Sequence, residues 1–449
     1  MRSFLRRFSL PRDPRAAPGR SGLRLVLANL GHLLGGKAAA GLMSLVYLVM
    51  VTHRLGAADY GVLVLVNAYA VLVGSVVAFS GFHGVVRFGG LALERGDRAG
   101  FARIVRSMAV VELACGVVAV IVAAACVPLV GARLGWSPAT IRLAVPYSLA
   151  IIATVRATPQ GLLQIAGRFD LIGLHHAVSP LIRLLGATGV WFAGGGLTGF
   201  ITVWLVAAVA EGLAMWGLGL IAWRRLAQDQ PLRGPWRGAM RDTDGMTRFV
   251  LITNFDITVR ELAPNLAPLT VGWLLGPAAA GLLALTQRAT ALLAQPTALL
   301  SQASYAVLAA QVARGDLAGL RHTVWRSAGV ALAVAIPIVL ALAIGGERLL
   351  VLVGGASFAG GTVLLILVAA ARAAGLASAP LAAGLTALGL PGRSMTVGLV
   401  TSLALYPVLP LLLWLVGTDG AGWHALLQSG VAIVALAAMV RTDARDRPA

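Results

Sequence analysis

Long apolar runs separated by short polar segments make up almost the whole chain. A membrane-spanning helix needs about 20 mostly apolar residues, and the runs predict about twelve such helices. Glycine and proline at 194–196 and 276–277 predict tight hairpins between neighbouring spans. The predicted spans lie at about 25–51, 60–80, 107–131, 144–166, 170–193, 199–222, 248–275, 277–300, 327–345, 361–389, 394–416 and 420–440.

The composition is that of a protein whose solvent is lipid. Of the 449 residues, 58% are hydrophobic and only 12% are charged, whereas soluble proteins carry roughly 25% charged residues. We therefore expect an all-α, polytopic membrane protein with about 12 transmembrane helices. The only cysteines, Cys115 and Cys126, lie in one apolar run, roughly 16 Å apart along a helix, too far to form a disulfide with each other.

The basic residues predict the orientation of the chain. The formal net charge is +19, but the bases lie in short loops between apolar runs, which indicates membrane topology and not nucleic-acid binding. Of the 36 Lys and Arg residues, 26 fall in the termini and in alternate loops, and four fall in the other loops. This asymmetry predicts an inner-membrane protein with both termini in the cytoplasm, including a basic tail at 1–24 and a short tail at 441–449.

An internal repeat divides the chain into two halves. The sequence L-G-x-A-x-x-G occurs at 55–61 and again at 275–281. The sequence R-G-D-x-A-G occurs at 95–100 and again at 314–319. A weaker third correspondence follows spans 4 and 10: Gly161 and Gly167-Arg168, Gly384 and Gly392-Arg393.

The repeat predicts two six-helix lobes at 25–225 and 248–440, joined by a cytoplasmic linker at 226–247. Because six is even, the two lobes have the same orientation and should be related by an axis along the membrane normal. We expect them to surround a central cavity, with a binding site between them near the midplane of the membrane.

Ten ionisable residues fall inside the predicted spans. Each costs roughly 2.5–3.5 kcal/mol at a lipid-facing helix centre, so ten would cost about 25–35 kcal/mol. Most of them must therefore face a wet cavity or one another. They are Lys37, Glu112, Arg156, Arg183, Glu211, Asp256, Arg260, Glu261, Arg288 and Arg372.

The spacing of these residues suggests different roles. Asp256 and Arg260 are four residues apart and can pair on one helix, either as a structural or as a functional pair. Glu112 lies close to a span end, where we expect it to reach the interface. The remaining bases lack a carboxylate three or four residues away, which favours an anionic ligand such as phosphate. The candidate substrate-binding residues are Lys37, Arg156, Arg183, Arg260, Arg288 and Arg372.

Three carboxylates, Glu211, Asp256 and Glu261, are candidates for proton or sodium coupling, or they neutralise the arginines. No metal-ligand spacing, P-loop, G-x-S-x-G or H-E-x-x-H motif is present. The sequence therefore predicts neither a metal site, a cofactor nor an enzymatic activity.

The segment from Thr52 to Gly61 resembles the polysaccharide-unit (Wzx-like) flippases, in which the first span ends in a pattern such as R-x-L-G-x-x-x-(Y/F)-G. The second copy at 275–281 and Gly167-Arg168-Phe169 fit the same resemblance. These flippases belong to a superfamily that also contains the lipid II flippases and the multidrug and toxin extruders. The resemblance implies two lobes around a basic cavity that moves an undecaprenyl-diphosphate-linked oligosaccharide outward, for lipopolysaccharide or exopolysaccharide synthesis. It also implies membrane lipids, a polysaccharide polymerase and glycosyltransferases as partners.

Two alternatives stay open at this point. A proton- or sodium-coupled exporter of the multidrug or major-facilitator type would share the two-lobe plan. The sequence Asp97-Arg98-Ala99-Gly100 partly matches the loop motif of major-facilitator proteins, but Leu93 stands where that motif has glycine. A membrane-embedded polymerase or glycosyltransferase would need a long outer loop, and the predicted outer loops are all shorter than about fifteen residues.

Overall fold

The computed structural model describes residues 20–291, 304–305 and 307–443, with side chains from residue 40 onward apart from 391 and 443. Within these ranges every regular element is helical, which confirms the all-α prediction. Most of the predicted tail at 1–24, the end of the tail at 441–449 and the side chain of Lys37 lie outside the described residues.

Helices of the first half lie at α2 (Arg20–Val77), α3 (Phe82–Gly84), the π-helical turn η1 (Val85–Gly89), α4 (Gly90–Glu94), α5 (Arg98–Arg133), α6 (Pro138–Tyr147), the 3-10 turn η2 (Ser148–Ala153), α7 (Ala157–Ile165), α8 (Phe169–Phe192) and α9 (Leu197–Leu226). Helices of the linker and the second half lie at α10 (Ala239–Asp242), α11 (Met246–Leu275), α12 (Pro277–Ala289), α14 (Leu317–Gly354), the 3-10 turn η3 (Ala356–Gly361), α15 (Thr362–Ala387), α16 (Pro391–Ala404), α17 (Val408–Val416) and α18 (Asp419–Asp443). In the described part of the chain, seven helical segments are long and apolar enough to cross a membrane, or eight if the bent pair α16 and α17 forms one span. A polytopic protein is thereby confirmed, and the number twelve stays a prediction.

The two sequence repeats have the same backbone structure. Gly56 breaks α2 with φ 69° and ψ −178°, and Gly276 separates α11 from α12 with φ 87° and ψ 174°. Both conformations lie in a region of backbone space that is open only to glycine. The second motif repeats as a cap: the Asp97 carboxylate accepts the Gly100 N–H at 2.7 Å, and the Asp316 carboxylate accepts the Gly319 N–H at 2.7 Å.

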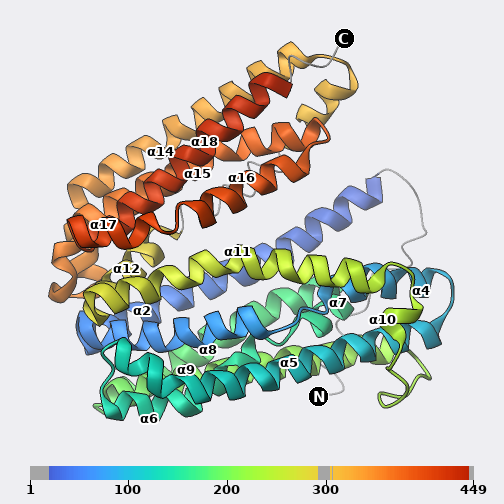
Figure 1. The fold of residues 1–449 in the computed structure, drawn as a ribbon, viewed down its shortest axis with the longest axis horizontal. Helices are drawn as coiled ribbons and strands as arrows, with labels where there is room; N and C mark the ends of the chain where they lie inside the picture. The colour runs from blue at the N-terminus through green and yellow to red at the C-terminus, as the bar shows by residue number, and fades with distance from the viewer. Residues whose placement is uncertain (1–19, 292–303, 306, 444–449) are drawn as a thin grey trace.

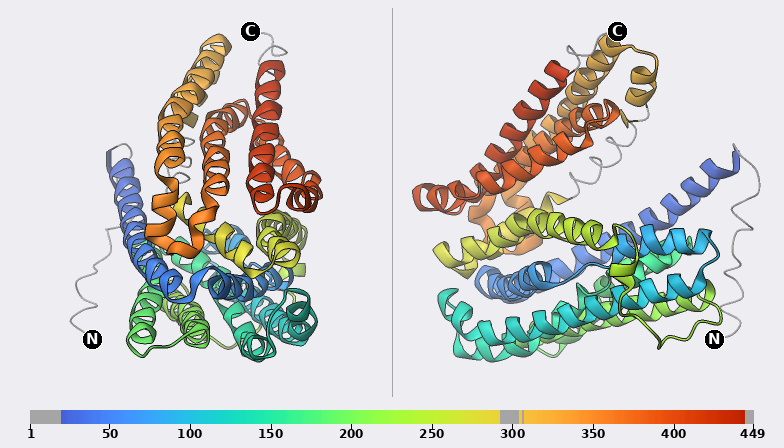
Figure 2. Two further views of the ribbon diagram at one scale, coloured as in Figure 1. Left: turned by 90° about the vertical axis from the view of Figure 1, so that its left-hand side faces the viewer. Right: turned by 45° about the vertical axis from the view of Figure 1, so that its right-hand side comes forward.

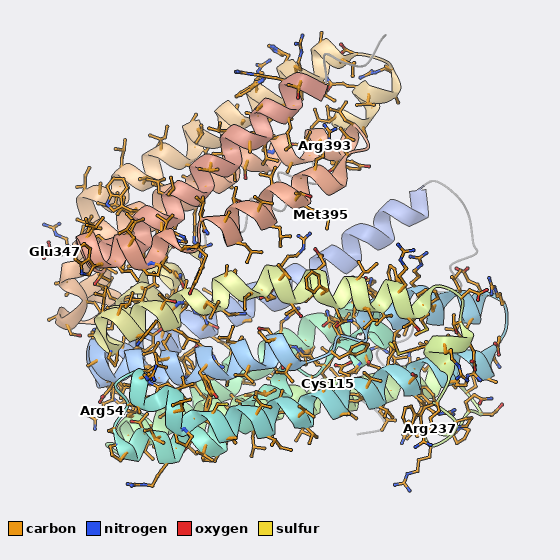
Figure 3. All side chains as sticks on the ribbon, in the orientation of Figure 1. Arg54, Cys115, Arg237, Glu347, Arg393 and Met395 are labelled. Carbon is orange, nitrogen blue, oxygen red and sulfur yellow. The ribbon has the colours of Figure 1, made fainter. Side chains whose placement is uncertain are left out.

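Both halves of the chain meet at one end of the molecule and diverge toward the other (Figures 1 and 2). We call the end that carries α6, α12 and α17 the outer end, because the charge asymmetry predicts it to be periplasmic, and the end that carries α10 the inner end. Arg54 lies at the outer end, whereas Arg237 and Arg393 lie at the inner end (Figure 3).

Packing of the apolar residues agrees with this divergence. The largest core cluster contains residues of both halves, among them Leu63 of α2 and Leu285 of α12. Two further clusters lie toward the inner end and are separate from each other: one includes Phe101 and Met246, and the other includes Leu320 with helices α15 and α18. The lobes therefore share a core at the outer end and have individual cores at the inner end.

Helix α11 begins on the first lobe. The Ser80 N–H donates to the Asn254 side-chain oxygen at 2.6 Å, and the Asn254 amide donates back to the Ser80 carbonyl at 3.2 Å. The rings of Phe88 and Phe249 meet edge to face with 5.6 Å between centroids. The first turns of α11 thus pack with the helices of the first half, while the division into lobes at 225 and 248 stays a prediction.

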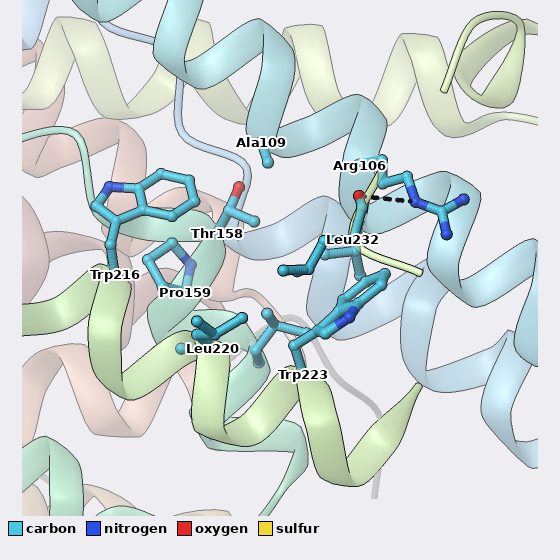
Figure 4. A pocket seen from close by; sticks show the side chains of 11 residues that line it. Arg106, Ala109, Thr158, Pro159, Trp216, Leu220, Trp223 and Leu232 are labelled. Atoms are coloured by element: carbon cyan, nitrogen blue, oxygen red, sulfur yellow. Dashed lines mark hydrogen bonds between the residues drawn. The ribbon is translucent and has the colours of Figure 1, made fainter. Parts of the chain in front are cut away.

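The linker between the halves is bound to α5. Arg106 donates to the carbonyl oxygens of Pro231, Leu232 and Pro235, and its guanidinium lies 5.5 Å from the ring centroid of Trp223. Leu232 thereby covers a mostly apolar pocket between α5, α7 and α9 (Figure 4). Because backbone carbonyls occupy the Arg106 donors, this side chain holds the linker in place.

Candidate functional site

Three of the candidate arginines lie about half a membrane thickness from the outer ends of their helices. Arg183, Arg288 and Arg372 are about 9–11 residues from the outer ends of α8, α12 and α15, which corresponds to about 14–17 Å of helix. The hydrocarbon core is about 30 Å thick. We call these three residues the midplane arginines.

Aromatic side chains hold Arg183 in place. Its guanidinium lies 4.3 Å from the ring centroid of Trp204, within the range of a cation–π interaction. It also donates to the Tyr47 hydroxyl at 3.4 Å, a long hydrogen bond. The buried Nε of Arg183 has no hydrogen-bond partner. A buried donor without an acceptor is unfavourable by about 1–3 kcal/mol, so the group is suited to an anionic ligand.

The charge of Arg288, in the second half of the chain, also reaches this tyrosine. Arg288 lies exposed on α12, and its charge acts on Tyr47 and Tyr60 of α2, as does that of Arg183. No ion pair with a carboxylate forms at Arg183 or Arg288 among the described residues. The charges of two guanidinium groups from different halves therefore act on Tyr47, and the Glu211 carboxylate acts on Arg183 without forming an ion pair with it.

The third midplane arginine lies within the second half. Arg372 of α15 donates from Nε to the Thr290 hydroxyl at 3.1 Å, at the C-terminal end of α12. This bond leaves the two terminal nitrogens of its guanidinium free of any described carboxylate. Arg372 of α15 is thus bound at the same end of α12 that carries Arg288.

Most of the other candidates lie closer to the inner end and are already paired. We call Arg156, Glu211, Asp256, Arg260 and Glu261 the inner charges. Those on α9 and α11 lie about 14–19 residues, or about 21–28 Å, from the outer ends of these helices.

Each inner charge has a described partner. Arg156 forms an ion pair with Glu211, whose backbone carbonyl also shares a 2.9 Å hydrogen bond with the ring of His175. Arg260 pairs with Asp256 at 2.8 Å, the helix-local pair that the spacing predicted. Glu261 is exposed and contacts the Asn265 amide at 3.5 Å.

Glu112 has a role that the sequence analysis missed. It is completely buried, so the expectation that it reaches the interface is wrong. Its two carboxylate oxygens accept the backbone N–H groups of Ala157 at 2.6 Å and Thr158 at 2.8 Å. Helix α7 starts at Ala157 with no side-chain cap of its own, and the carboxylate from α5 supplies the missing acceptors.

This arrangement separates two kinds of basic residue by depth. At the inner level, Arg156 and Arg260 are neutralised by carboxylates. At the midplane, no described carboxylate pairs with Arg183, Arg288 or Arg372. The described residues contain no group of three or more His, Cys, Asp and Glu side chains that could hold a metal ion. The midplane arrangement is suited to holding a multivalent anion.

Repeated membrane-spanning helices with ionisable residues inside the spans are the arrangement of a multi-pass transporter. The fold matches an inward-facing multidrug resistance MATE family transporter of the MOP superfamily, with a TM-score of 0.70, 14% identity, and coverage of 91% of this chain and 96% of the other. It also matches the lipid II flippase MurJ in its inward closed conformation, with a TM-score of 0.67, 12% identity, and coverage of 92% and 89%.

The chain belongs to the family of polysaccharide biosynthesis proteins, which its residues 54–360 match. A relative is the inner membrane protein YghQ of Escherichia coli (strain K12), which is 27% identical over 282 residues, or 63% of this chain and 79% of the relative. These matches confirm the resemblance to polysaccharide-unit flippases, and the chain is a multi-pass protein of the inner membrane. The match begins at Arg54, one residue before the first copy of the repeated motif.

Proposed function

We propose that this protein moves an undecaprenyl-diphosphate-linked oligosaccharide across the cytoplasmic membrane, from the cytoplasmic to the periplasmic leaflet. The product supplies the synthesis of a surface polysaccharide. The observation that carries the proposal is that Arg183 and Arg288, from different halves of the chain, form no ion pair with a described carboxylate and both act electrostatically on Tyr47. The family of the chain and the likeness of its fold to a lipid II flippase support it.

A diphosphate fits this pair by charge and by geometry. A guanidinium offers a planar fork of donors that matches the oxygens of a phosphate. The Arg183 Nε lacks an acceptor, and Arg288 is exposed on its helix. Because the two arginines come from different halves of the chain, a diphosphate bound by both connects the two lobes. Its binding therefore depends on the relative position of the lobes. We expect Arg372, which is bound to Thr290 at the end of α12, to contact the same ligand or the first sugar.

The substrate reaches the midplane from the inner end. The lobes have separate cores at that end, so a head group can pass between them while the polyprenyl chain remains in lipid. On this route the diphosphate competes with Glu211 for Arg156. Exchange of one anionic partner for another keeps the arginine neutralised, which avoids much of the cost of an unpaired charge in the membrane.

Displaced carboxylates are the coupling candidates of this mechanism. When the diphosphate pairs with Arg156, Glu211 loses its counter-charge and becomes able to take a proton or sodium ion. In the same way, Asp256 loses its counter-charge when the diphosphate pairs with Arg260, and Glu261 lies beside that pair. Both termini face the cytoplasm in this scheme, and the expected partners are the glycosyltransferases that supply the substrate and the polymerase that uses it.

An exporter of small organic cations is the alternative. Such a protein needs an available carboxylate where the cation binds. The three candidate carboxylates Glu211, Asp256 and Glu261 are already contacted by Arg156, Arg260 and Asn265. The midplane arginines are positively charged, which favours an anionic substrate over a cationic one.

A deletion strain tests the proposal. Membrane lipids are extracted from cells lacking the chain, the polyprenyl-diphosphate sugars are quantified, and surface polysaccharide is measured. We expect accumulated lipid-linked intermediate and lost surface polymer, both restored by the wild-type chain and by Arg237→Ala, a change in the linker. Arg183→Ala and Arg288→Ala should insert normally but fail to restore either. Unchanged lipid intermediates and normal surface polymer in the deletion strain would contradict the proposal.

A further inference from the structure

The two copies of the repeated L-G-x-A-x-x-G motif lie against each other at the outer end. Gly61 of the first copy and Gly281 of the second are in direct contact. A Cβ atom added at Gly61 would lie 3.1 Å from the Gly281 nitrogen, and one added at Gly281 would lie 3.0 Å from the Gly61 nitrogen. The contact is thus the same in both directions, as expected for elements related by a two-fold axis.

The carbonyl groups one turn earlier repeat the same symmetry. A Cβ at Gly61 would overlap the carbonyl oxygen of Pro277, and a Cβ at Gly281 would overlap that of Ala57. Ala57 and Pro277 are equivalent positions of the repeat. The closest atoms are backbone atoms, which cannot rotate away as a side chain can. Only glycine allows this approach of α2 and α12.

Further contacts between the halves surround the glycine pair. The Thr52 hydroxyl donates to the Val353 carbonyl at 2.7 Å in a buried position, and the Ala57 N–H donates to the Ser357 hydroxyl at 3.2 Å. Tyr60 meets Phe358 edge to face at 6.1 Å between centroids. All of these residues lie on the outer side of the midplane arginines, between them and the predicted periplasm.

We propose that the two motif copies form the outer gate, which closes the midplane site toward the periplasm through the contact of Gly61 with Gly281. Release of any substrate to the periplasm requires this contact to separate. The glycines therefore set how readily the gate closes, and a side chain at either position holds the lobes apart at the outer end. This proposal rests on the proposed function in one respect only: it assumes that a transported substrate leaves the protein at the outer end.

Accessibility of a midplane cysteine tests the gate without any substrate. In a chain with Cys115→Ser and Cys126→Ser, Gln287→Cys beside Arg288 is labelled from the periplasmic side with a membrane-impermeant maleimide. We expect Gly61→Ala and Gly281→Ala each to raise the labelling rate at least about tenfold, because the closed state becomes sterically blocked. Gly41→Ala, on the same helix α2 but with open space around it, is the matched control and should leave the rate unchanged.

A cross-link gives an independent measurement if an alanine variant fails to insert. Ala57→Cys with Ser357→Cys is designed to join the two sides of the gate, where the Ala57 backbone nitrogen lies 3.2 Å from the Ser357 hydroxyl oxygen. Oxidation should block periplasmic labelling of Gln287→Cys and stop transport, and reduction should restore both. Equal labelling in the Gly61, Gly281 and Gly41 variants, or undiminished transport in the cross-linked protein, would overturn the proposal. Because labelling needs no substrate, its result can be interpreted even if the protein is not a flippase.

Discussion

Replacing Glu112 by alanine should destabilise the first lobe through the loss of a helix cap. The side chain is completely buried, and its oxygens accept two backbone N–H groups at the start of α7. Alanine leaves both donors without a partner. An unsatisfied buried donor costs about 1–3 kcal/mol, so we expect a loss of about 2–6 kcal/mol. Glutamine keeps one acceptor oxygen and should fall between alanine and wild type.

Thermal unfolding of the purified protein in detergent measures the effect. The unfolding entropy of globular proteins is about 2.1 cal/mol/K per residue, so 449 residues correspond to about 0.9 kcal/mol per degree. Glu112→Ala should therefore lower the midpoint by about 2–6 °C at a fixed scan rate. Glu261→Ala removes an exposed carboxylate on α11 and should change the midpoint by less than about 1 °C.

The refuting result is a midpoint for Glu112→Ala equal to that of Glu261→Ala. It would mean that the N–H groups of Ala157 and Thr158 find other acceptors, or that the carboxylate does not cap α7. A normal midpoint for Glu112→Gln with a low midpoint for Glu112→Ala would show that one acceptor oxygen is sufficient.

Two further predictions follow from the charged groups. Arg156→Ala and Glu211→Ala should each reduce the amount of folded protein in the membrane, because each leaves a partner charge unneutralised, whereas the double variant should recover most of it; an additive loss would contradict the direct pairing. Arg106→Ala should release the linker at 231–235 and speed its cleavage in limited proteolysis several-fold relative to Arg98→Ala, and equal cleavage rates would show that the carbonyl contacts do not hold the segment.

The repeat was readable from the sequence because it depends on local backbone chemistry. Glycine at 56 and 276 and aspartate at 97 and 316 are residues whose backbone conformation and capping are determined within a few positions. The weak third correspondence was displaced by three residues. Gly167 and Gly389, both with positive φ, end α7 and α15 with the same pair of turn hydrogen bonds, so Gly389 and not Gly392 is the counterpart of Gly167.

Ion pairs could be predicted from the sequence only where both residues lie on the same helix. Spacing of four residues predicted the pair of Asp256 and Arg260, and it forms at 2.8 Å. Arg156 and Glu211 are 55 residues apart, and no local rule connects them. Glu112 was assigned to the interface because it lies near a span end, whereas its acceptors are needed by a helix start that a sequence pattern does not reveal.

The midplane arginines could be selected from the sequence, but their surroundings could not. Arg183, Arg288 and Arg372 were selected because they lack a local carboxylate, and no described carboxylate pairs with them in the structure. What the sequence did not reveal was the aromatic setting of Arg183, since Tyr47 lies 136 residues earlier on α2 and the packing of Trp204, on the next helix α9, is set by tertiary structure. The assignment of these arginines to substrate therefore stays a prediction with a defined geometry.

Transport by the purified chain tests the central claim most directly. The protein is reconstituted into liposomes that carry a polyprenyl-diphosphate oligosaccharide on one leaflet, and a membrane-impermeant glycosidase reports how much substrate has crossed. We predict crossing with the wild-type chain, a loss of at least about tenfold with Arg183→Ala or Arg288→Ala, and wild-type crossing with Arg237→Ala. Crossing at the wild-type rate in both midplane variants, or no crossing above empty liposomes with a well-folded wild-type chain, would contradict the account.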